Sequence, residues 1–249
     1  MNQHIPIDVE AIERATVAAV APREVEELRG WLVAYDDVTV NRARSAVPLR
    51  HDAPDAKAVP QIVERYRARG IMPNFRVAQL ASMHEVEGEL ARAGLQSLQP
   101  TQVLVARALE VARAAAEGGV AVRREPDDAW AAVFLGEGFD PADGASRVAT
   151  LARANGSLFA GIREGAAVVA GGVLALGHGW ASIHGMRTAL SHRGRGLATR
   201  ILAALAREAL KRDHDRIALQ VEVANDTATR VYRRCGFELA WTYAYWREQ

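Results

Sequence analysis

A short segment rich in arginine and glycine has the residue types that bind an anion. The segment is Arg193-Gly194-Arg195-Gly196-Leu197-Ala198. It falls between an apolar, strand-like run and an amphipathic helical pattern that begins at Leu197. The N–H groups that open a helix lack partners within the helix, so they and the helix dipole favour negative charge there. Glycines let a phosphate approach the backbone without a Cβ in the way, and arginines add charge-assisted hydrogen bonds. We therefore predict a pyrophosphate site at this loop.

Two other kinds of phosphate-binding motif do not fit this loop. A dinucleotide-binding fingerprint needs a glycine or alanine three residues after Gly196, where this chain has Thr199. The strand before the loop belongs to a meander and does not open a βαβ unit, which also disfavours a dinucleotide-binding fold. A P-loop needs Gly-Lys followed by Ser or Thr, and the sequence does not contain it.

Strands and helices that would position the loop can be read from hydrophobic periodicity in the second half of the chain. A helix is predicted near 145–154 and another from Leu197, whose apolar residues repeat along one stripe. Strands are predicted at 157–163, 167–176, 180–188, 217–223 and 239–246. Asn225 or Asp226 can cap a final helix, which ends at Gly236. The first three strands form an antiparallel meander that leads into the loop.

A second motif lies downstream, behind the strand-like Ala218-Leu219-Gln220-Val221. It has the spacing N-x-x-A-x-x-x-Y-x-x-x-G-F, carried by Asn225, Ala228, Tyr232, Gly236 and Phe237. Together with Arg-x-x-Gly-x-Ala in the loop, it resembles the GNAT acetyltransferase superfamily over about residues 123–249. The resemblance implies an α/β (α+β) fold with a mixed, mostly antiparallel sheet flanked by helices. It also implies an N-acetyltransferase that uses acetyl-CoA as cosubstrate, needs no metal and moves acetyl to a primary amine by direct attack.

The resemblance assigns roles to individual residues. The strand before the loop is expected to splay from its neighbour, so that the pantetheine arm pairs with the opened backbone at 186–188. Tyr232 is the implied proton donor to the leaving thiolate, since a phenol can hydrogen-bond a thiolate at neutral pH. The residues expected to bind the cofactor are Met186, Arg187, Thr188, Arg193, Gly194, Arg195, Gly196, Leu197, Ala198, Thr199, Asn225, Ala228 and Tyr232.

The general base departs from the family pattern. Some relatives that acetylate N-terminal amines carry glutamate where this chain has Gln220, and glutamine cannot usefully accept a proton. Glu222 lies two residues further along the strand and so points to the same face, which makes it the predicted base. His184 on the preceding strand and a relay through water are the alternatives.

Three groups of residues near these motifs have a less specific interpretation. Trp241, Tyr243, Tyr245 and Trp246 lie near the closing strand, where alternate residues face the interior. At least two of them are expected to pack in the core or at the edge, and one pair is a candidate for lining the acceptor pocket. Cys235 is expected to be a small buried group, because direct transfer needs no acyl-enzyme. Three acidic residues precede the strands and suggest a cationic or amino-acid-like acceptor: Glu137, Asp140 and Asp143.

The first half of the chain repeats the order of the second half at a fixed offset. Strands are predicted at 30–35, 38–47 and 75–80, and helices at 59–68 and 85–93. Shifting the sequence by 142 residues places Gly94 on Gly236 and His51 on Arg193 without a gap. We therefore predict a degenerate GNAT-like lobe at 1–117 and a catalytic lobe at 118–249. The segment equivalent to the loop is 51–56, which has Pro54 and two aspartates in place of glycines, so one acetyl-CoA per chain is expected.

Composition bounds the partners and the compartment. The 31 basic and 30 acidic residues nearly cancel, so nucleic acid and anionic membrane are not expected as partners. The single cysteine excludes an internal disulfide and a multi-cysteine zinc site, which favours the cytoplasm. The apolar stretch before Pro22 is too short to span a membrane. A monomer or homodimer acting on a small-molecule or peptide amine is predicted, and a non-catalytic acyl-CoA-binding regulator or scaffold is the alternative.

Overall fold

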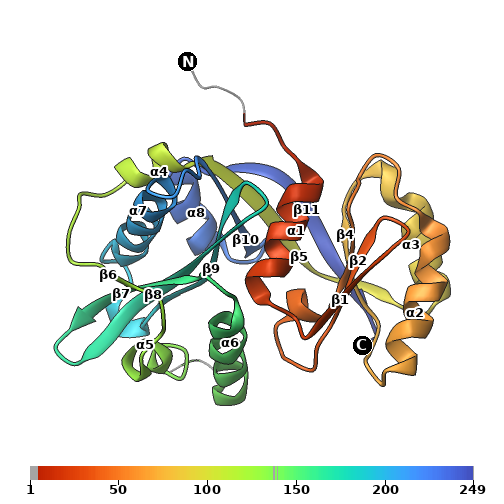
Figure 1. Ribbon diagram of the computed structural model, residues 1–249, viewed down its shortest axis with the longest axis horizontal. Coiled ribbons are helices and arrows are strands. Elements are labelled where there is room, and N and C mark those ends of the chain that lie inside the picture. The colour runs from red at the N-terminus through yellow and green to blue at the C-terminus, as the bar shows by residue number, and fades with distance from the viewer. Residues whose placement is uncertain (1–4, 137, 139, 249) are drawn as a thin grey trace.

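The computed structural model describes residues 5–136, 138 and 140–248, which form an elongated molecule around one continuous sheet (Figure 1). The sheet has eleven strands in the order β1-β2-β3-β4-β11-β5-β10-β9-β8-β7-β6. Only the pairs β3–β4 and β9–β10 are parallel, and the other pairs are antiparallel. The predicted fold class, a mixed and mostly antiparallel sheet flanked by helices, is confirmed.

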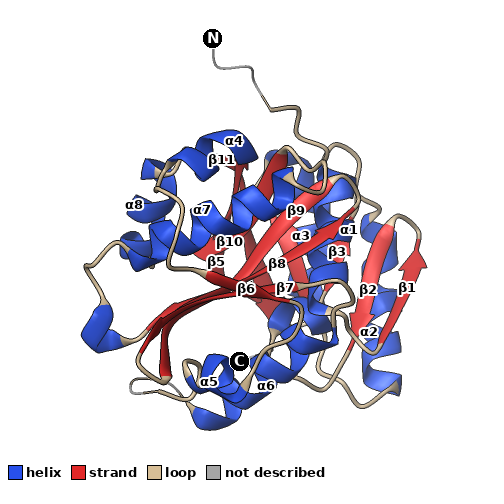
Figure 2. Cartoon of the chain, turned by 60° about the vertical axis from the view of Figure 1, so that its left-hand side comes forward, coloured by secondary structure: helices blue, strands red, loops and turns tan. Residues whose placement is uncertain are grey.

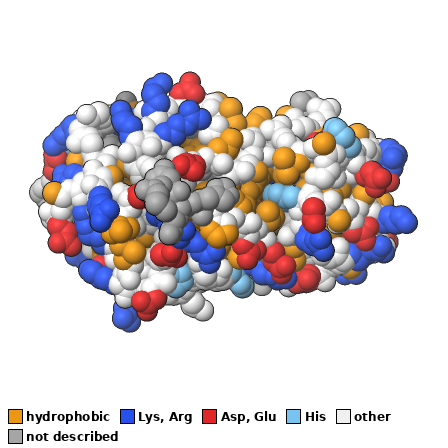
Figure 3. Space-filling model, turned by 90° about the horizontal axis from the view of Figure 1, so that it is seen from above, with side chains coloured by type: hydrophobic (Ala, Val, Ile, Leu, Met, Phe, Trp, Pro, Cys, Tyr) orange, Lys and Arg blue, Asp and Glu red, His pale blue; other side chains and the backbone are white. Residues whose placement is uncertain are grey.

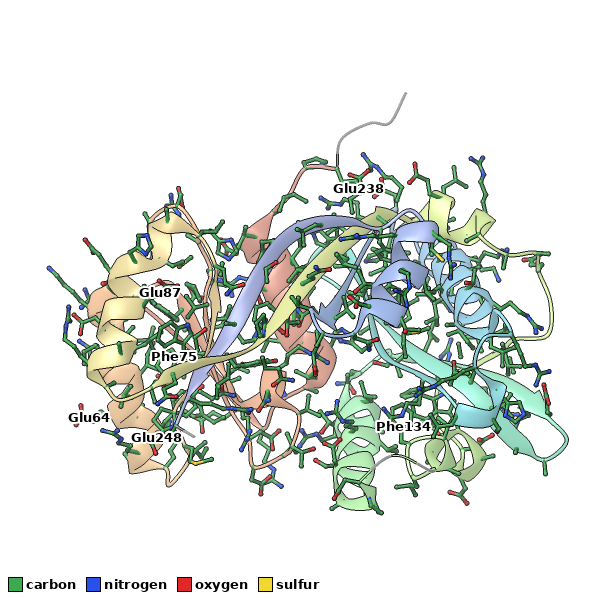
Figure 4. The ribbon with its side chains drawn as sticks, turned by 180° about the vertical axis from the view of Figure 1, so that it is seen from behind. Glu64, Phe75, Glu87, Phe134, Glu238 and Glu248 are labelled. Atoms are coloured by element: carbon green, nitrogen blue, oxygen red, sulfur yellow. The ribbon has the colours of Figure 1, made fainter. Side chains whose placement is uncertain are left out.

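The first half supplies five strands and four α-helices. The strands are β1 (Glu24–Leu28), β2 (Trp31–Tyr35), β3 (Ala46–Pro48), β4 (Asn74–Ala78) and β5 (Gln96–Arg107). The helices are α1 (Val9–Val20), α2 (Val59–Ala68), α3 (His84–Arg92) and α4 (Ala108–Arg113), with 3-10 turns η1 (Asn41–Arg44), η2 (Ala56–Ala58) and η3 (Ala81–Met83). Helices α2 and α3 pack on this end of the sheet over Phe75, whose ring meets Trp31 edge-on at 5.9 Å between centroids (Figure 4).

The second half supplies the remaining strands and helices. The strands are β6 (Ala121–Arg123), β7 (Leu158–Glu164), β8 (Ala167–Gly177), β9 (Trp180–Thr188), β10 (Arg216–Glu222) and β11 (Glu238–Arg247). The helices are α5 (Asp128–Ala132), α6 (Pro141–Arg153), α7 (Leu197–Leu210) and α8 (Asp226–Arg234), with the 3-10 turn η4 (Leu190–His192). Helices α4, α7 and α8 cover one face of the sheet here, and α5 and α6 cover the other (Figure 2).

The predicted repeat is visible in the bounds of the elements. Helices α3 and α8 differ by 142 residues at both of their ends, and β4 and β10 begin 142 residues apart, as do β5 and β11. The final strand of each half, however, crosses to the other half. β11 lies between β4 and β5, and β5 lies between β11 and β10 (Figure 1). The two halves therefore share one sheet, and the division at 117/118 stays a prediction about folding units.

The predicted strand at 38–47 is wrong over most of its length. Residues 41–44 form the 3-10 turn η1, and only β3 at the end of this segment is extended. The turn buries Ala43 and leaves the polar side chains of Asn41, Arg42 and Arg44 partly exposed. Because three of the four residues are long and polar, a buried central strand could not have accommodated them. Strand β5 was not predicted, although the repeat offset from 239–246 points to 97–104.

Candidate active site

The neighbouring strands β9 and β10 are parallel, and they separate from one another towards their C-terminal ends. Their register contains only three pairs, the last joining Leu219 to Ile183, although both strands continue beyond it. The register of β9 against β8 also shifts, because Val173 pairs with His184 whereas Gly171 pairs with Arg187. The extra residue on β9 is a β-bulge, which bends a strand and increases its twist. The backbone at 184–188 is thus directed away from β10, as the resemblance implies.

A cavity of about 270 Å³ lies at this opening and is lined by both halves of the chain. The second half contributes the ends of β9 and β10, the ring of Phe134 and Tyr232 of α8. Phe134 lies between α5, α6 and the sheet (Figure 4). The first half contributes Val40, Arg42, Gln99 and Thr101. The first half therefore forms one wall of the cavity.

The predicted phosphate loop connects β9 to α7 with backbone geometry that requires glycine. Gly194 and Gly196 have φ values of +77° and +73°, which L side chains rarely adopt. An added Cβ at either glycine would meet no atom within 4 Å among the described residues, so their surface is open. Gly196 is the N-cap of α7 and no side chain caps this end. The first N–H groups of a 14-residue helix are thus available to an anion.

The two arginines of the loop are placed differently. Arg195 donates to Glu164 Oε1 at 2.6 Å, and His192 meets the other oxygen of the same carboxylate at 3.2 Å. These contacts lower the pKa of Glu164, with the Arg195 hydrogen bond the largest cause. Arg193 lies near the Thr188 carbonyl, 3.5 Å from Nε. A phosphate at the loop would compete with Glu164 for Arg195, so the backbone N–H groups are the less committed donors.

Tyr232 lies inside the protein with its ring against the cavity. Its exposed fraction is 8%, and its ring packs against Phe237 at 5.9 Å between centroids. Burial raises the pKa of the phenol to about 12, so the hydroxyl stays protonated at neutral pH. Asn225 accepts a hydrogen bond from the Ala228 N–H at 3.1 Å and so caps α8. The predicted cap is confirmed, and it fixes the helix that carries the phenol.

Cys235 lies in the core of the second half, beside the partly buried Thr199 of α7. The Cys235 thiol is buried, and burial raises its pKa although a hydrogen bond with Thr199 opposes the shift. A buried thiol with a raised pKa is a poor nucleophile. The expectation that Cys235 is a small buried group is confirmed.

The three candidates for the base differ in their surroundings. Glu222 is exposed at the end of β10, lines the cavity and accepts a hydrogen bond from Gln99 Nε2 at 2.7 Å. Gln99 has a φ of +53°, an uncommon conformation for a residue other than glycine. His184 is only 5% exposed, and burial lowers its pKa to about 3. So weak a base accepts a proton poorly at neutral pH, and the surroundings favour Glu222.

Gln220 is held by hydrogen bonds at both ends of its amide. Its Nε2 donates to Thr16 Oγ1 at 3.1 Å, and its Oε1 accepts from the Tyr243 hydroxyl at 2.8 Å. The Tyr243 and Tyr245 hydroxyls are 3.3 Å apart, and both residues line the cavity. These two tyrosines are therefore the aromatic pair of the closing strand that faces the cavity. Trp241 instead packs against the His51 ring at 5.0 Å between centroids.

The two carboxylates of the segment 51–56 in the first half are paired with nearby arginines. Arg50 binds Asp52 through two hydrogen bonds of 3.0 and 2.7 Å. Asp55 accepts from Arg29 at 2.6 Å, and its carbonyl accepts from Trp31 Nε1 at 3.0 Å. Both carboxylates therefore have arginine partners. They lie at the positions that the 142-residue offset aligns with the loop 193–198.

The two described carboxylates of the acidic loop before the strands, those of Asp140 and Asp143, both have partners within the protein. Asp140 accepts from the Asp143 N–H at 2.8 Å and caps α6, and Asp143 accepts from Arg147 Nε at 2.6 Å. Glu137 lies outside the described residues. Both described aspartates have structural partners, so they give no support to a cationic acceptor.

The face of the molecule drawn in Figure 3 shows no strong separation of charge. Acidic and basic side chains are interspersed over the face in Figure 3, as the formal net charge of +1 suggests. Across the described residues, no helix combines the length and apolar character needed to cross a bilayer. Nor do the described parts of the chain bring three or more His, Cys, Asp or Glu side chains together in a metal-binding group.

The comparison with family models gives one match over almost the whole chain. Residues 7–246 match the family described as "Probable histone acetyltransferase Rv0428c C-terminal". A comparison with curated proteins finds no match.

Solved structures share the fold at low sequence identity. A GCN5-related N-acetyltransferase from Kribbella flavida is 18% identical with a TM-score of 0.71, over 96% of this chain and 95% of that one. One from Sphaerobacter thermophilus is 15% identical with a TM-score of 0.59, covering 98% and 93%. A tandem GNAT protein from the clavulanic acid biosynthesis pathway is 15% identical with a TM-score of 0.61, covering 97% and 87%.

Proposed function

Because the chain belongs to the Rv0428c C-terminal family and has the GNAT fold, we propose that it is an acetyl-CoA-dependent N-acetyltransferase acting on a primary amine. The observation that carries the proposal is the cavity at the separated ends of β9 and β10, which adjoins the segment leading to the uncapped N-terminus of α7. Acetyl-CoA has phosphates at one end and a thioester at the other. The N-terminus of α7 would bind the phosphates, and the cavity would hold the thioester. The single buried cysteine also suits the cytoplasm.

Acetyl-CoA would be held by the backbone of 186–188 and by the loop 193–198. The positive φ values of Gly194 and Gly196 and the open space beside them fit the close approach of a pyrophosphate. Leu197, Ala198 and Thr199 supply the free N–H groups of the first turn of α7. Asn225 and Ala228 act indirectly, because they fix the start of the helix that carries Tyr232. When bound, acetyl-CoA supplies an acetyl thioester.

The chain's own groups would move two protons during transfer. The neutral amine attacks the thioester carbon, a C–N bond forms and the C–S bond breaks. The Tyr232 hydroxyl gives its proton to the departing sulfur, and it is available because burial keeps the phenol protonated. Glu222 takes the proton from the amine directly or through water, while Gln99 orients its carboxylate. No acyl-enzyme forms, which agrees with the inaccessible Cys235 thiol.

Release of free CoA thiol tests the proposal. The full chain is incubated with acetyl-CoA and pools of primary amines, and free thiol is measured against controls lacking the amine or the protein. Amine-dependent release by wild type, reduced about 100-fold or more in Tyr232→Phe, supports it. Tight binding of acetyl-CoA without release for any amine would instead identify the chain as a non-catalytic acyl-CoA-binding regulator or scaffold.

A further inference from the structure

The charged side chains around the cavity are mostly positive. Three arginines line it: Arg42 of η1, Arg147 of α6 and Arg187 of β9. Glu222 is the one carboxylate among the described residues that line it. Asp143 pairs with Arg147, but the lining still carries more positive than negative charge. An excess of positive charge in a small, partly enclosed space attracts an anion more strongly than it would in bulk water.

The side chain of Arg42 has a donor that no described residue pairs with. Its Nε is buried and makes no hydrogen bond to any described residue, and no ion pair in the described part of the chain includes it. The carboxylate of Glu13 contributes some favourable charge, but Arg76 holds Glu13 at 2.7 Å and both side chains are buried. A guanidinium has five N–H donors in a planar fork that matches a carboxylate. The Arg42 guanidinium can therefore donate hydrogen bonds to a ligand in the cavity.

The other two arginines add positive potential from positions that the fold fixes. Arg147 is held by Asp143 at 2.6 Å, which places it on the cavity side of α6. Arg187 lies over the Phe134 ring, 5.6 Å from its centroid. The pKa of Arg187 is lowered to about 10, first by burial and then by the charge of Arg147, with Asp143 opposing the shift. An anion in the cavity would relieve this repulsion.

His184 gives the cavity a further unsatisfied polar group. Its Nε2 is buried and has no hydrogen-bond partner among the described residues, although the residue lines the cavity. Buried polar atoms are nearly always paired, so an unpaired one at a cavity wall suggests that a ligand supplies the partner. The imidazole is neutral, which lets Nε2 accept or donate according to its tautomer.

From these contacts we propose that the acceptor is a small amine that also carries a carboxylate, and that Arg42 binds this carboxylate. The inference deepens the proposed function and rests on it. The acetyl group has no charge, and the loop 193–198 proposed for the pyrophosphate contributes no described residue to the cavity. The cavity of about 270 Å³ suits a molecule of amino-acid size. A lysine-rich peptide would bring positive charge towards three arginines.

The test compares amino acids with their carboxamides, which keep the amine but lack the carboxylate. We expect wild type to have a kcat/KM for at least one acid about 10- to 100-fold above that for its amide, as for a charged hydrogen bond. Arg42→Gln should bring the ratio close to one while calorimetry shows unchanged acetyl-CoA affinity. Comparing ratios between variants cancels the difference in basicity between the two amines.

Arg44→Gln is the matched control. Arg44 lies in the same turn and is partly exposed, but its Nη2 contacts Asn41 Oδ1 and it is not one of the described residues that line the cavity. This variant should keep the wild-type ratio. Equal use of acid and amide by wild type, or the same ratio in Arg42→Gln, overturns the inference.

Failure of the proposed function would give a different result. If no amine supports thiol release, the enzyme assignment fails, and the carboxylate site is judged by calorimetry with N-acetyl amino acids and their amides. Binding of the acids that is lost in Arg42→Gln supports the site. Absence of binding, or equal binding of acid and amide, overturns it.

Discussion

Acidification should destabilise this protein through His184 at a higher pH than through carboxylates whose pKa is lowered, such as that of Asp127. The imidazole is buried, and burial lowers its pKa to about 3 from an ordinary value of 6.5, with Arg42 and Arg76 adding repulsion. In the unfolded chain the same group binds a proton near pH 6.5. The contribution of the neutral histidine to stability is therefore complete above pH 6.5 and is lost as the pH falls from 6.5 towards 3.

The size of the effect follows from linkage. Between pH 7 and pH 5 the unfolded state takes up most of one proton at this site and the folded state almost none. The free energy of unfolding should therefore fall by about 2 kcal/mol from His184 alone. His51, whose pKa burial lowers to about 4, adds a loss in the same direction. Carboxylates with lowered pKa values, such as that of Asp127, lose their contribution only below this range.

Urea unfolding of wild type and His184→Gln at pH 7 and pH 5 measures the prediction. The variant removes the proton uptake at 184 and leaves His51 and the Glu13–Arg76 pair in both proteins, so their effects cancel. The pH-dependent loss of stability should be smaller in the variant by about 2 kcal/mol. The absolute stability of the variant does not enter the comparison. Equal losses in the two proteins would refute the account of a buried, neutral imidazole.

Three other predictions concern the cofactor and the base. Gly196→Val should abolish acetyl-CoA binding, measured by calorimetry, because a φ of +73° is strained for valine. The protein should stay folded, because the added side chain meets open space. Unchanged affinity would show that the pyrophosphate does not bind at this loop. Glu222→Gln should slow acetylation by about 100-fold and change its pH profile, and a profile superimposable on that of wild type would exclude Glu222 as the base. Calorimetric titration should give one equivalent of acetyl-CoA per chain, because the first-half segment 51–56 has two arginine-paired aspartates and no glycine. Two equivalents of similar affinity would contradict a degenerate first half.

The elements of the second half were largely predictable because their signals are local. The strand 180–188 has the bounds that its pattern predicts, and α7 begins at Leu197 as its apolar stripe predicts. The Asn225 cap and the glycine after α8 mark that helix in the sequence without reference to the rest of the fold. The first half has weaker signals, and its turn η1 interrupts a run that composition alone assigns to a strand.

The order of strands was not predictable in the same way, since it depends on pairing between segments far apart in the chain. β5 begins with Gln96-Ser97-Leu98-Gln99-Pro100, a polar stretch containing proline, and gives no clear strand pattern there. Its partners are β10 and β11, both more than 100 residues away. The polar cavity residues supplied by the first half, Arg42, Gln99 and Thr101, were missed for this reason. Their polar types suit a site, but only the exchanged strand and η1 bring them to it.

The exchange of β5 and β11 explains how the first half can contribute to the cavity at the end of β10 although its segment 51–56 has no glycine. Gln99 on β5 reaches Glu222, and Thr16 on α1 holds Gln220, so first-half side chains orient both polar residues at the end of β10. A further contact joins the halves at the last residue of α6, where Arg153 donates to the buried Asp36 at 2.6 Å. A catalytic half cut free of its partner would lose these contacts and expose the edge of β10. The first half therefore supplies one wall of the cavity and the partners of both polar side chains at the end of β10.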